Sequence, residues 1–246
     1  MSRGLGDVYK RQLVKREVED MGRLIIIEGG DGSGKATQTA LLKERLQQEG
    51  YKVKSVSFPN YDSPAAMPVK MYLAGDFGKN PSDINPFVAS SLYAVDRFAS
   101  FRMEWQAFYE AGGIILADRY TTSNMVHQMV KYDDEAERNT FLDWLEDFEF
   151  VKFGLPRPDV VCLLDMPLAV SEALMAERKH KTGGATGDIH ERDHAYLGRV
   201  HAAYDELVAR YGWQRIACAD SKNVLRTIED IHEDVYRAIL QVLADA

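Results

Sequence analysis

Residues 29–38, GGDGSGKATQ, constrain the fold of this chain more than any other stretch. They follow an apolar segment, RLIIIE, and precede a helical pattern, which is the strand–loop–helix order that a phosphate-binding loop requires. The backbone N–H groups of such a loop can surround the phosphates of ATP, and its lysine, here Lys35, reaches the phosphoryl group that is transferred. We therefore predict an ATP site formed by Gly29, Gly30, Asp31, Gly32, Ser33, Gly34, Lys35, Ala36 and Thr37.

One position of this loop departs from the motif. Ala36 stands where a serine or threonine hydroxyl usually binds Mg²⁺. Thr37 lies about 100° further around the helix, so we do not expect it to replace that hydroxyl. Because Mg²⁺ keeps several waters and takes only one or two protein ligands, we expect it to be held by ATP phosphates, waters and the carboxylate of Asp118.

Five apolar segments alternate with long helical patterns along the chain. They are residues 23–28, 53–58, 114–118, 160–165 and 213–218. Continuous runs of Ile, Val and Leu are typical of strands covered on both faces, and strand–helix alternation favours parallel pairing through right-handed crossovers. The pattern predicts an α/β protein with the three-layer P-loop NTPase fold, in which helices flank a five-stranded parallel sheet.

A single domain is expected from residue 21 to residue 246. Residues 1–20 have mixed charge and no apolar face, and their start, MSRGLGDVYKRQ, looks like read-through from a cloning or sequencing adapter. We expect a non-native or disordered leader, with a native extension as the alternative. Residues 179–188, KHKTGGATGD, are basic and glycine-rich, and they are predicted to form a mobile loop.

Charge and composition exclude several classes of function. A net charge of −8 and a pI near 5.3 disfavour a broad nucleic-acid surface. No apolar run approaches the roughly 20 residues that span a bilayer, so no membrane partner is expected. Cys162 and Cys218 lie in apolar runs and are expected to be buried thiols in a reducing compartment, the cytoplasm. A small ligand fits these properties best.

Further motifs follow the loop in a fixed order: FPNY (58–61), SSLYAVDR (90–97), LADRYTTSN (116–124), FGLPRPD (153–159) and LLDMP (163–167). Together with the loop they resemble the thymidylate kinases, over roughly residues 22–243. The resemblance implies transfer of the γ-phosphoryl group of ATP to dTMP, with Mg²⁺, giving dTDP and ADP in dTTP biosynthesis. It also implies a homodimer.

The motif residues suit this chemistry because phosphoryl transfer between two polyanions requires several converging cations. Lys35, Arg97 and Arg119 are candidates for that charge. In the resemblance, Arg119 holds the acceptor phosphate and Arg97 reaches the edge of the pyrimidine. Tyr93 lies beneath the base, four residues before Arg97 and therefore on the same helix face.

The resemblance assigns further residues. Those implied to bind dTMP are Asp31, Phe58, Tyr61, Tyr93, Arg97, Arg119, Asn124, His127 and Glu191. Those implied to be catalytic are Lys35, Arg119, Asp31 and, from a lid over about residues 178–192, Arg178 and Arg192. His127 stands where relatives often carry Tyr or Gln near the sugar, so the rejection of a 2′-hydroxyl is left open.

Two other functions remain open on the sequence. A deoxynucleoside kinase would act on a 5′-hydroxyl and would need a strong base near the loop instead of a second phosphate-binding arginine. A nucleotide-binding module could have lost catalysis with Ala36. The string HERDH (190–194) matches the HExxH pattern of zinc proteases but follows a glycine-rich loop without an obvious third ligand, so we do not expect a protease.

Overall fold

The computed structural model describes residues 21–182 and 194–244, without the side chains of residues 177–182 and 194. The strands are β1 (Arg23–Glu28), β2 (Val53–Ser57), β3 (Ile114–Asp118), β4 (Val160–Asp165) and β5 (Gln214–Ala217). The α-helices are α2 (Lys35–Gln48), α3 (Met67–Ala74), α4 (Pro86–Ser100), α5 (Gln106–Glu110), α6 (Thr121–Met129), α7 (Glu135–Glu146), α8 (Leu168–Thr182), α9 (His194–Tyr211) and α10 (Ile228–Ala244). Short 3₁₀ helices are η1 (Pro64–Ala66) and η2 (Pro81–Asp83), and π-helical segments are η3 (Phe101–Trp105) and η4 (Asp147–Lys152).

The five strands form one parallel sheet in the order β2-β3-β1-β4-β5. Each central strand is buried on both faces because its side chains alternate between two hydrophobic cores. In β1, Leu24 and Ile26 contribute to one core, whereas Ile25 and Ile27 contribute to the other. The continuous apolar runs in the sequence reflect this two-sided burial.

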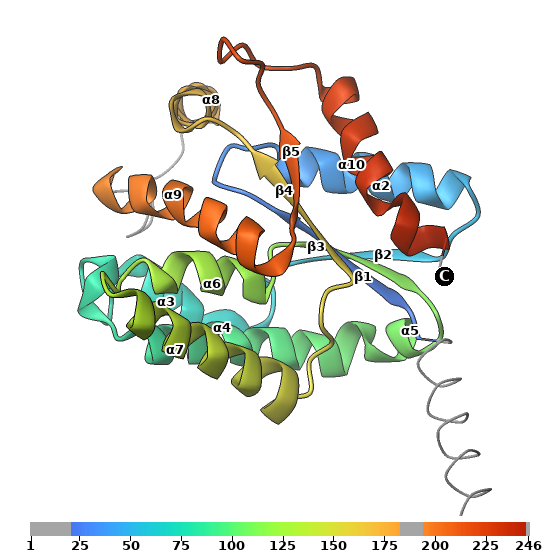
Figure 1. Ribbon diagram of the computed structural model, residues 1–246. Helices are drawn as coiled ribbons and strands as arrows, with labels where there is room; N and C mark the ends of the chain where they lie inside the picture. The colour runs from blue at the N-terminus through green and yellow to red at the C-terminus, as the bar shows by residue number, and fades with distance from the viewer. Residues whose placement is uncertain (1–20, 183–193, 245–246) are drawn as a thin grey trace, which may run out of the picture.

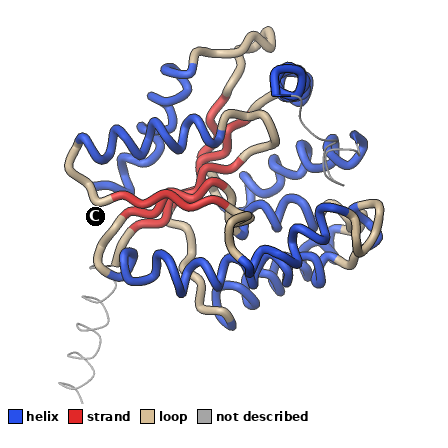
Figure 2. The backbone as a smooth tube through the Cα atoms, turned by 180° about the vertical axis from the view of Figure 1, so that it is seen from behind, coloured by secondary structure: helices blue, strands red, loops and turns tan. Residues whose placement is uncertain are grey.

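Helices cover both faces of the sheet (Figures 1 and 2). On one face, α2 and α10 pack on the sheet through apolar residues that include Leu42, Leu46, Val235 and Ile239. On the other face lie α4 to α7 and α9, and the second core there includes Trp105 of η3, Phe141 of α7 and Leu207 of α9. The prediction of a three-layer α/β fold with five parallel strands is confirmed.

This topology places the carboxyl ends of β1 and β3 side by side, because Ile27 pairs with Asp118 in the parallel register. Ligands of open α/β sheets bind outside the carboxyl ends of the strands. The phosphate-binding loop leaves β1 and the DRY motif leaves β3, so both reach the same edge of the sheet.

Some details differ from the sequence prediction. Helix α8 extends to Thr182, so the first four residues of the predicted loop at 179–188 are helical. The rest of that loop, with Glu191 and Arg192, lies outside the described residues. The helical stretch that α4 and α5 form is interrupted by the π-helical segment η3.

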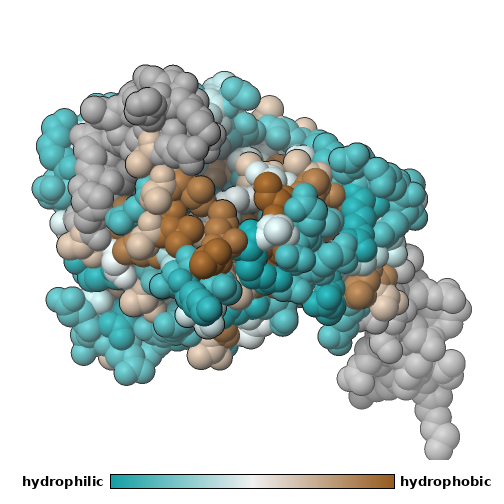
Figure 3. Space-filling model, turned by 90° about the horizontal axis from the view of Figure 1, so that it is seen from above, coloured by the Kyte–Doolittle hydropathy of each residue, from teal (hydrophilic) through white to brown (hydrophobic). Residues whose placement is uncertain are grey.

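The visible surface in Figure 3 is mostly hydrophilic, with areas of apolar side chains between the polar ones. Across residues 21–182 and 194–244, every helix is too short or too polar to cross a membrane.

Candidate active site

The phosphate-binding loop adopts a conformation that depends on glycine. Gly34 precedes α2 with a φ of 90°, and Gly32 has a φ of 77°; both values lie in the left-handed region that favours glycine. A Cβ atom on Gly32 would also lie 2.9 Å from the carbonyl oxygen of Ser171. The loop can therefore turn tightly against α8 and point its N–H groups into the cavity above it.

Lys35, the first residue of α2, is nearly buried and folds back over the loop. Its Nζ donates hydrogen bonds to the carbonyl oxygens of Gly29, at 2.9 Å, and Gly30, at 2.8 Å. Burial, followed by the nearby Arg119 guanidinium, lowers the pKa of Lys35 to about 8. Lys35 thus lies in the loop as a cation without a direct carboxylate partner among the described residues, which suits a group that binds phosphate.

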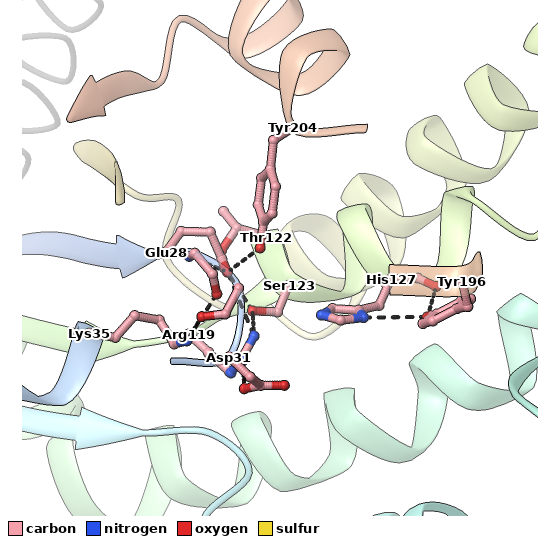
Figure 4. Close-up of polar contacts among 11 residues, drawn as sticks. Glu28, Asp31, Lys35, Arg119, Thr122, Ser123, His127, Tyr196 and Tyr204 are labelled. Atoms are coloured by element: carbon pink, nitrogen blue, oxygen red, sulfur yellow. Dashed lines mark hydrogen bonds and ion pairs between the residues drawn. The ribbon is translucent and has the colours of Figure 1, made fainter. Parts of the chain in front are cut away.

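Arg119 follows β3 directly and reaches the loop from the other side (Figure 4). Its Nη2 donates to Asp31 Oδ1 at 2.6 Å, and its Nη1 lies 3.8 Å from Glu28 Oε1. The Arg119 guanidinium holds the pKa of Asp31 well below its usual range. Arg119 has a φ of 68°, a left-handed conformation that is uncommon for a residue with a side chain.

Glu28, the last residue of β1, is fully buried and joins three parts of the structure (Figure 4). Its carboxylate accepts hydrogen bonds from the N–H of Gly29 at 2.9 Å and from the hydroxyls of Thr122 at 2.6 Å and Ser123 at 2.7 Å. The hydroxyl of Tyr204, on α9, donates a longer bond of 3.4 Å. Glu28 therefore fixes the start of the loop relative to α6 and α9.

Asp118 is the residue that we predicted to hold a metal ion. It ends β3 and lines the cavity with Lys35 and Ala36. Its carboxylate accepts no hydrogen bond from any described residue, and burial raises its pKa in spite of the nearby Lys35 and Arg119. A single carboxylate with free oxygens fits a Mg²⁺ ion that takes its other ligands from phosphates and water. No cluster of three potential metal ligands occurs in the described part of the chain.

A buried ion pair lies at the end of the cavity where the base is predicted to bind. Arg97, on α4, donates from Nε to Glu149 Oε2 at 2.7 Å and from Nη2 to Glu149 Oε1 at 2.5 Å. Thr121 also donates to Glu149, at 2.7 Å, and both members of the ion pair are almost inaccessible to solvent. The pair fixes the plane of the Arg97 guanidinium, and Arg97 also lines the cavity.

A second contact joins α6 to α9. The hydroxyl of Tyr196 donates to the carbonyl oxygen of His127 at 2.5 Å and lies 3.3 Å from His127 Nδ1 (Figure 4). His127 also contributes to the low pKa of Asp31, after the larger effects of Arg119, burial and Lys35. His127 is therefore electrostatically part of the loop and Arg119 cluster.

One cavity of about 750 Å³ brings most of the predicted site residues together. Its lining includes Asp31, Gly32, Ser33, Gly34, Lys35, Ala36, Thr37, Phe58, Tyr61, Tyr93, Arg97, Asp118, Arg119, Asn124 and His127. Gly29 and Gly30 do not belong to its lining, but their carbonyl oxygens accept hydrogen bonds from Lys35 Nζ. Arg178 lies in α8 with its side chain undescribed. The individual roles of these residues stay predictions.

Sequence reasoning missed several residues of the site. Leu225 and Arg226, between β5 and α10, and Ile228, the first residue of α10, line the cavity near α2, and no motif marked them. Glu28 and Glu149 were missed because each lies in an apolar or helical pattern without a recognisable signature. Gln128 also lines the cavity.

The sequence matches the family model described as thymidylate kinase over residues 27–233. The thymidylate kinase of Mycobacterium tuberculosis is 31% identical over 195 residues, which cover 77% of this chain and 87% of that protein. The thymidylate kinase of Exiguobacterium is 30% identical, with coverages of 85% and 91%. A solved structure of thymidylate kinase from Candida albicans superposes with a TM-score of 0.66 at 21% identity, covering 92% of this chain and 94% of that one, which supports the fold.

Proposed function

Because this chain belongs to the thymidylate kinase family, we propose that it transfers the γ-phosphoryl group of ATP to dTMP, giving dTDP and ADP. The observation that carries the proposal is the presence of Lys35, Arg119 and Arg97 on the wall of one cavity. Lys35 belongs to the donor loop, Arg119 lies beside that loop, and Arg97 comes from α4 together with Tyr93. This arrangement provides separate cations for the donor phosphates, the acceptor phosphate and the base.

Lys35 and Arg119, the two cations near the loop, bind different phosphate groups in this proposal. We expect ATP phosphates to replace the carbonyl oxygens of Gly29 and Gly30 as partners of Lys35. Arg119 then binds the acceptor phosphate, and Asp31 and Glu28 keep its guanidinium oriented. Because these groups are fixed before the substrates meet, they can stabilise transition-state charge without large reorganisation.

Mg²⁺ would be held by Asp118 together with ATP phosphates and waters, and when bound it would neutralise charge on the transferring group. Ala36 offers no oxygen, so Asp118 carries the protein's share of that binding. Arg178 and Arg192 are proposed to add positive charge from the lid, and Glu191 to contribute to the dTMP site, as the resemblance implies.

The geometry also argues against the deoxynucleoside kinase alternative. Such an enzyme needs a base close to the loop, but the carboxylate of Asp31 is tied to Arg119 and has a very low pKa. A carboxylate of this kind is a weak base. Glu28 is buried and already accepts several hydrogen bonds.

A steady-state assay of ADP release with dTMP, dUMP, dGMP and thymidine tests the proposal. We expect turnover with dTMP and Mg-ATP. Phosphorylation of thymidine without turnover of dTMP would replace the proposal by the deoxynucleoside kinase, and no ADP release with any acceptor would favour a non-catalytic module.

We also propose a cytoplasmic homodimer. Val88, Val95 and Phe98 are exposed on α4, at spacings that place them along one side of the helix, and Met103 in η3 is 84% exposed. An exposed apolar stripe of this kind supports association with a second copy. Both cysteines are buried free thiols, which suits a reducing compartment. Light scattering gives the molar mass; a monomer at micromolar concentration would contradict the assembly.

A further inference from the structure

Asp96, on α4, is a buried carboxylate to which the proposed reaction gives no role. Its Oδ2 accepts a hydrogen bond of 2.8 Å from the backbone N–H of Asn60, whereas Oδ1 has no partner among the described residues. Burial raises the pKa of the Asp96 carboxyl, so the ionised form is disfavoured at this position. Most buried polar atoms in proteins are hydrogen-bonded, so a buried carboxylate with one unpaired oxygen requires an explanation.

The position of Asn60 supplies one. It belongs to the turn that follows β2, residues 58–61. The ring of Phe58 packs against the ring of Tyr120, with the ring centres 6.0 Å apart. Because Tyr120 follows Arg119 directly, the turn forms the wall of the cavity beside the proposed site of the acceptor phosphate. The residues of the turn that line the cavity are Phe58, Pro59 and Tyr61.

A second carboxylate holds the side chain of Asn60. Glu104, in η3, accepts a hydrogen bond of 2.8 Å from Asn60 Nδ2 at Oε1, and its Oε2 accepts one of 3.1 Å from the hydroxyl of Ser100. Glu104 reaches the turn from a π-helical segment, and π-bulges frequently occur at functional sites. Asn60 is therefore held by its backbone and by its side chain, and both carboxylates come from the helical stretch of α4 and η3.

We propose that Asp96 and Glu104 are positioning residues of the acceptor site, which act through Asn60 by fixing the turn that carries Phe58 and Tyr61. Neither carboxylate belongs to the lining of the cavity, so both act from behind its wall. A charged acceptor makes a stronger hydrogen bond than a neutral one, which explains why a carboxylate is kept at this buried position. The inference rests on the proposed function, because it names the residues that hold that site in shape.

The first test removes the acceptor of the Asn60 N–H group. In Asp96→Ala we expect the KM for dTMP to rise at least about fivefold, with kcat changed less than about threefold and the KM for ATP within about twofold, because the turn borders the acceptor and not the reacting groups. Asp96→Asn keeps an oxygen that can accept the same hydrogen bond, so its KM for dTMP should stay within about threefold of the parent value. A KM for dTMP in Asp96→Asn as high as in Asp96→Ala would overturn the inference.

Asp159→Ala is the matched control. Asp159 Oδ2 accepts a hydrogen bond of 2.7 Å from the N–H of Leu24, near the amino end of β1 and away from the cavity, and burial raises the pKa of Asp159 as well. Both alanine variants should melt below the parent, since each loses a hydrogen bond that joins two elements. Only Asp96→Ala should change the KM for dTMP. Equal rises in this KM would show a general effect of lost stability and would contradict a positioning role.

Hydrogen exchange of the Asn60 amide, followed by NMR without substrates, measures the turn directly. The amide should exchange at least about tenfold faster in Asp96→Ala than in the parent, because its acceptor is gone. Glu104→Ala provides a second variant if Asp96→Ala does not fold, since Glu104 is exposed, and it should also raise the KM for dTMP. Unchanged exchange in Asp96→Ala, or an unchanged KM in both variants, would refute the inference. If the parent does not phosphorylate dTMP, the proposed function fails, and the exchange rate alone then decides whether Asp96 holds the turn.

Discussion

Replacing Glu149 by Gln tests how the predicted base contact is supported. Glu149 accepts hydrogen bonds from Arg97 and Thr121, and both charges of the ion pair are at most 2% exposed. Glu149→Gln removes the negative charge and places an N–H group against a donor, so one charged hydrogen bond is lost and Arg97 remains buried without compensation. Breaking a buried pair in this way costs about 3–5 kcal/mol in the free energy of unfolding.

For a chain of this size, each kcal/mol lowers the melting temperature by about 2–4 °C, so Glu149→Gln should melt roughly 6–20 °C below the parent. Urea unfolding followed by circular dichroism measures the free energy directly. Asp147→Asn is the control, because Asp147 pairs with Lys152 in the same π-helical segment but both side chains are at least half exposed. Exposed pairs contribute about 0–1 kcal/mol. Equal effects of the two substitutions would refute the reasoning.

The double variant Arg97→Leu with Glu149→Leu separates stability from recognition. Replacing both members of a buried pair by apolar residues is often neutral for stability. The double variant should therefore recover most of the lost unfolding free energy, yet still discriminate poorly between dTMP and competing monophosphates. Recovery of base choice together with stability would show that Arg97 does not contact the base.

Four further substitutions test the phosphate-binding end of the cavity. Arg119→Ala should lower kcat/KM for dTMP by at least about a hundredfold in steady-state kinetics, if about 3 kcal/mol of charged hydrogen bonding is lost; a loss below tenfold would contradict a phosphate contact. The pKa of Lys35 without ligand is lowered to about 8, and phosphate binding needs the protonated amine. The value of kcat/KM for ATP should therefore be maximal below pH 8 and fall as the pH rises through 8. Lys35→Arg should abolish that fall, because arginine stays protonated. A pH profile that is flat to pH 10 in the parent would count against this role. Ala36→Ser should raise the apparent Mg²⁺ affinity only about fivefold, or about 1 kcal/mol. Asp118→Asn should lower that affinity by a larger factor. A hundredfold increase in turnover by Ala36→Ser would show that the parent loop is defective.

The sequence predicted those parts of the structure that depend on local pattern. The strands were recognisable because both of their faces are buried, and the loop because its glycines and Lys35 are contiguous. The partner of Arg97 could not be predicted from the sequence. Glu149 is 52 positions away and lies in a π-helical segment that has no sequence signature. The end of α8 was misjudged because charge suggested a loop, although Lys and Arg are good helix formers.

The left-handed backbone conformation of Arg119 creates a conflict between backbone stability, which favours glycine, and the need for a cation at this position. Glycine would occupy a φ of 68° without steric strain, whereas a residue with a Cβ atom is less stable there by about 1–2 kcal/mol. Arg119→Gly should consequently be less destabilising than Arg119→Ala, although both lose the guanidinium. The backbone at this position favours glycine, whereas the buried carboxylate of Glu28, the carboxylate of Asp31 and the proposed acceptor phosphate require the cation. A thermostable descendant of this chain that still acts on monophosphates must therefore gain its stability elsewhere.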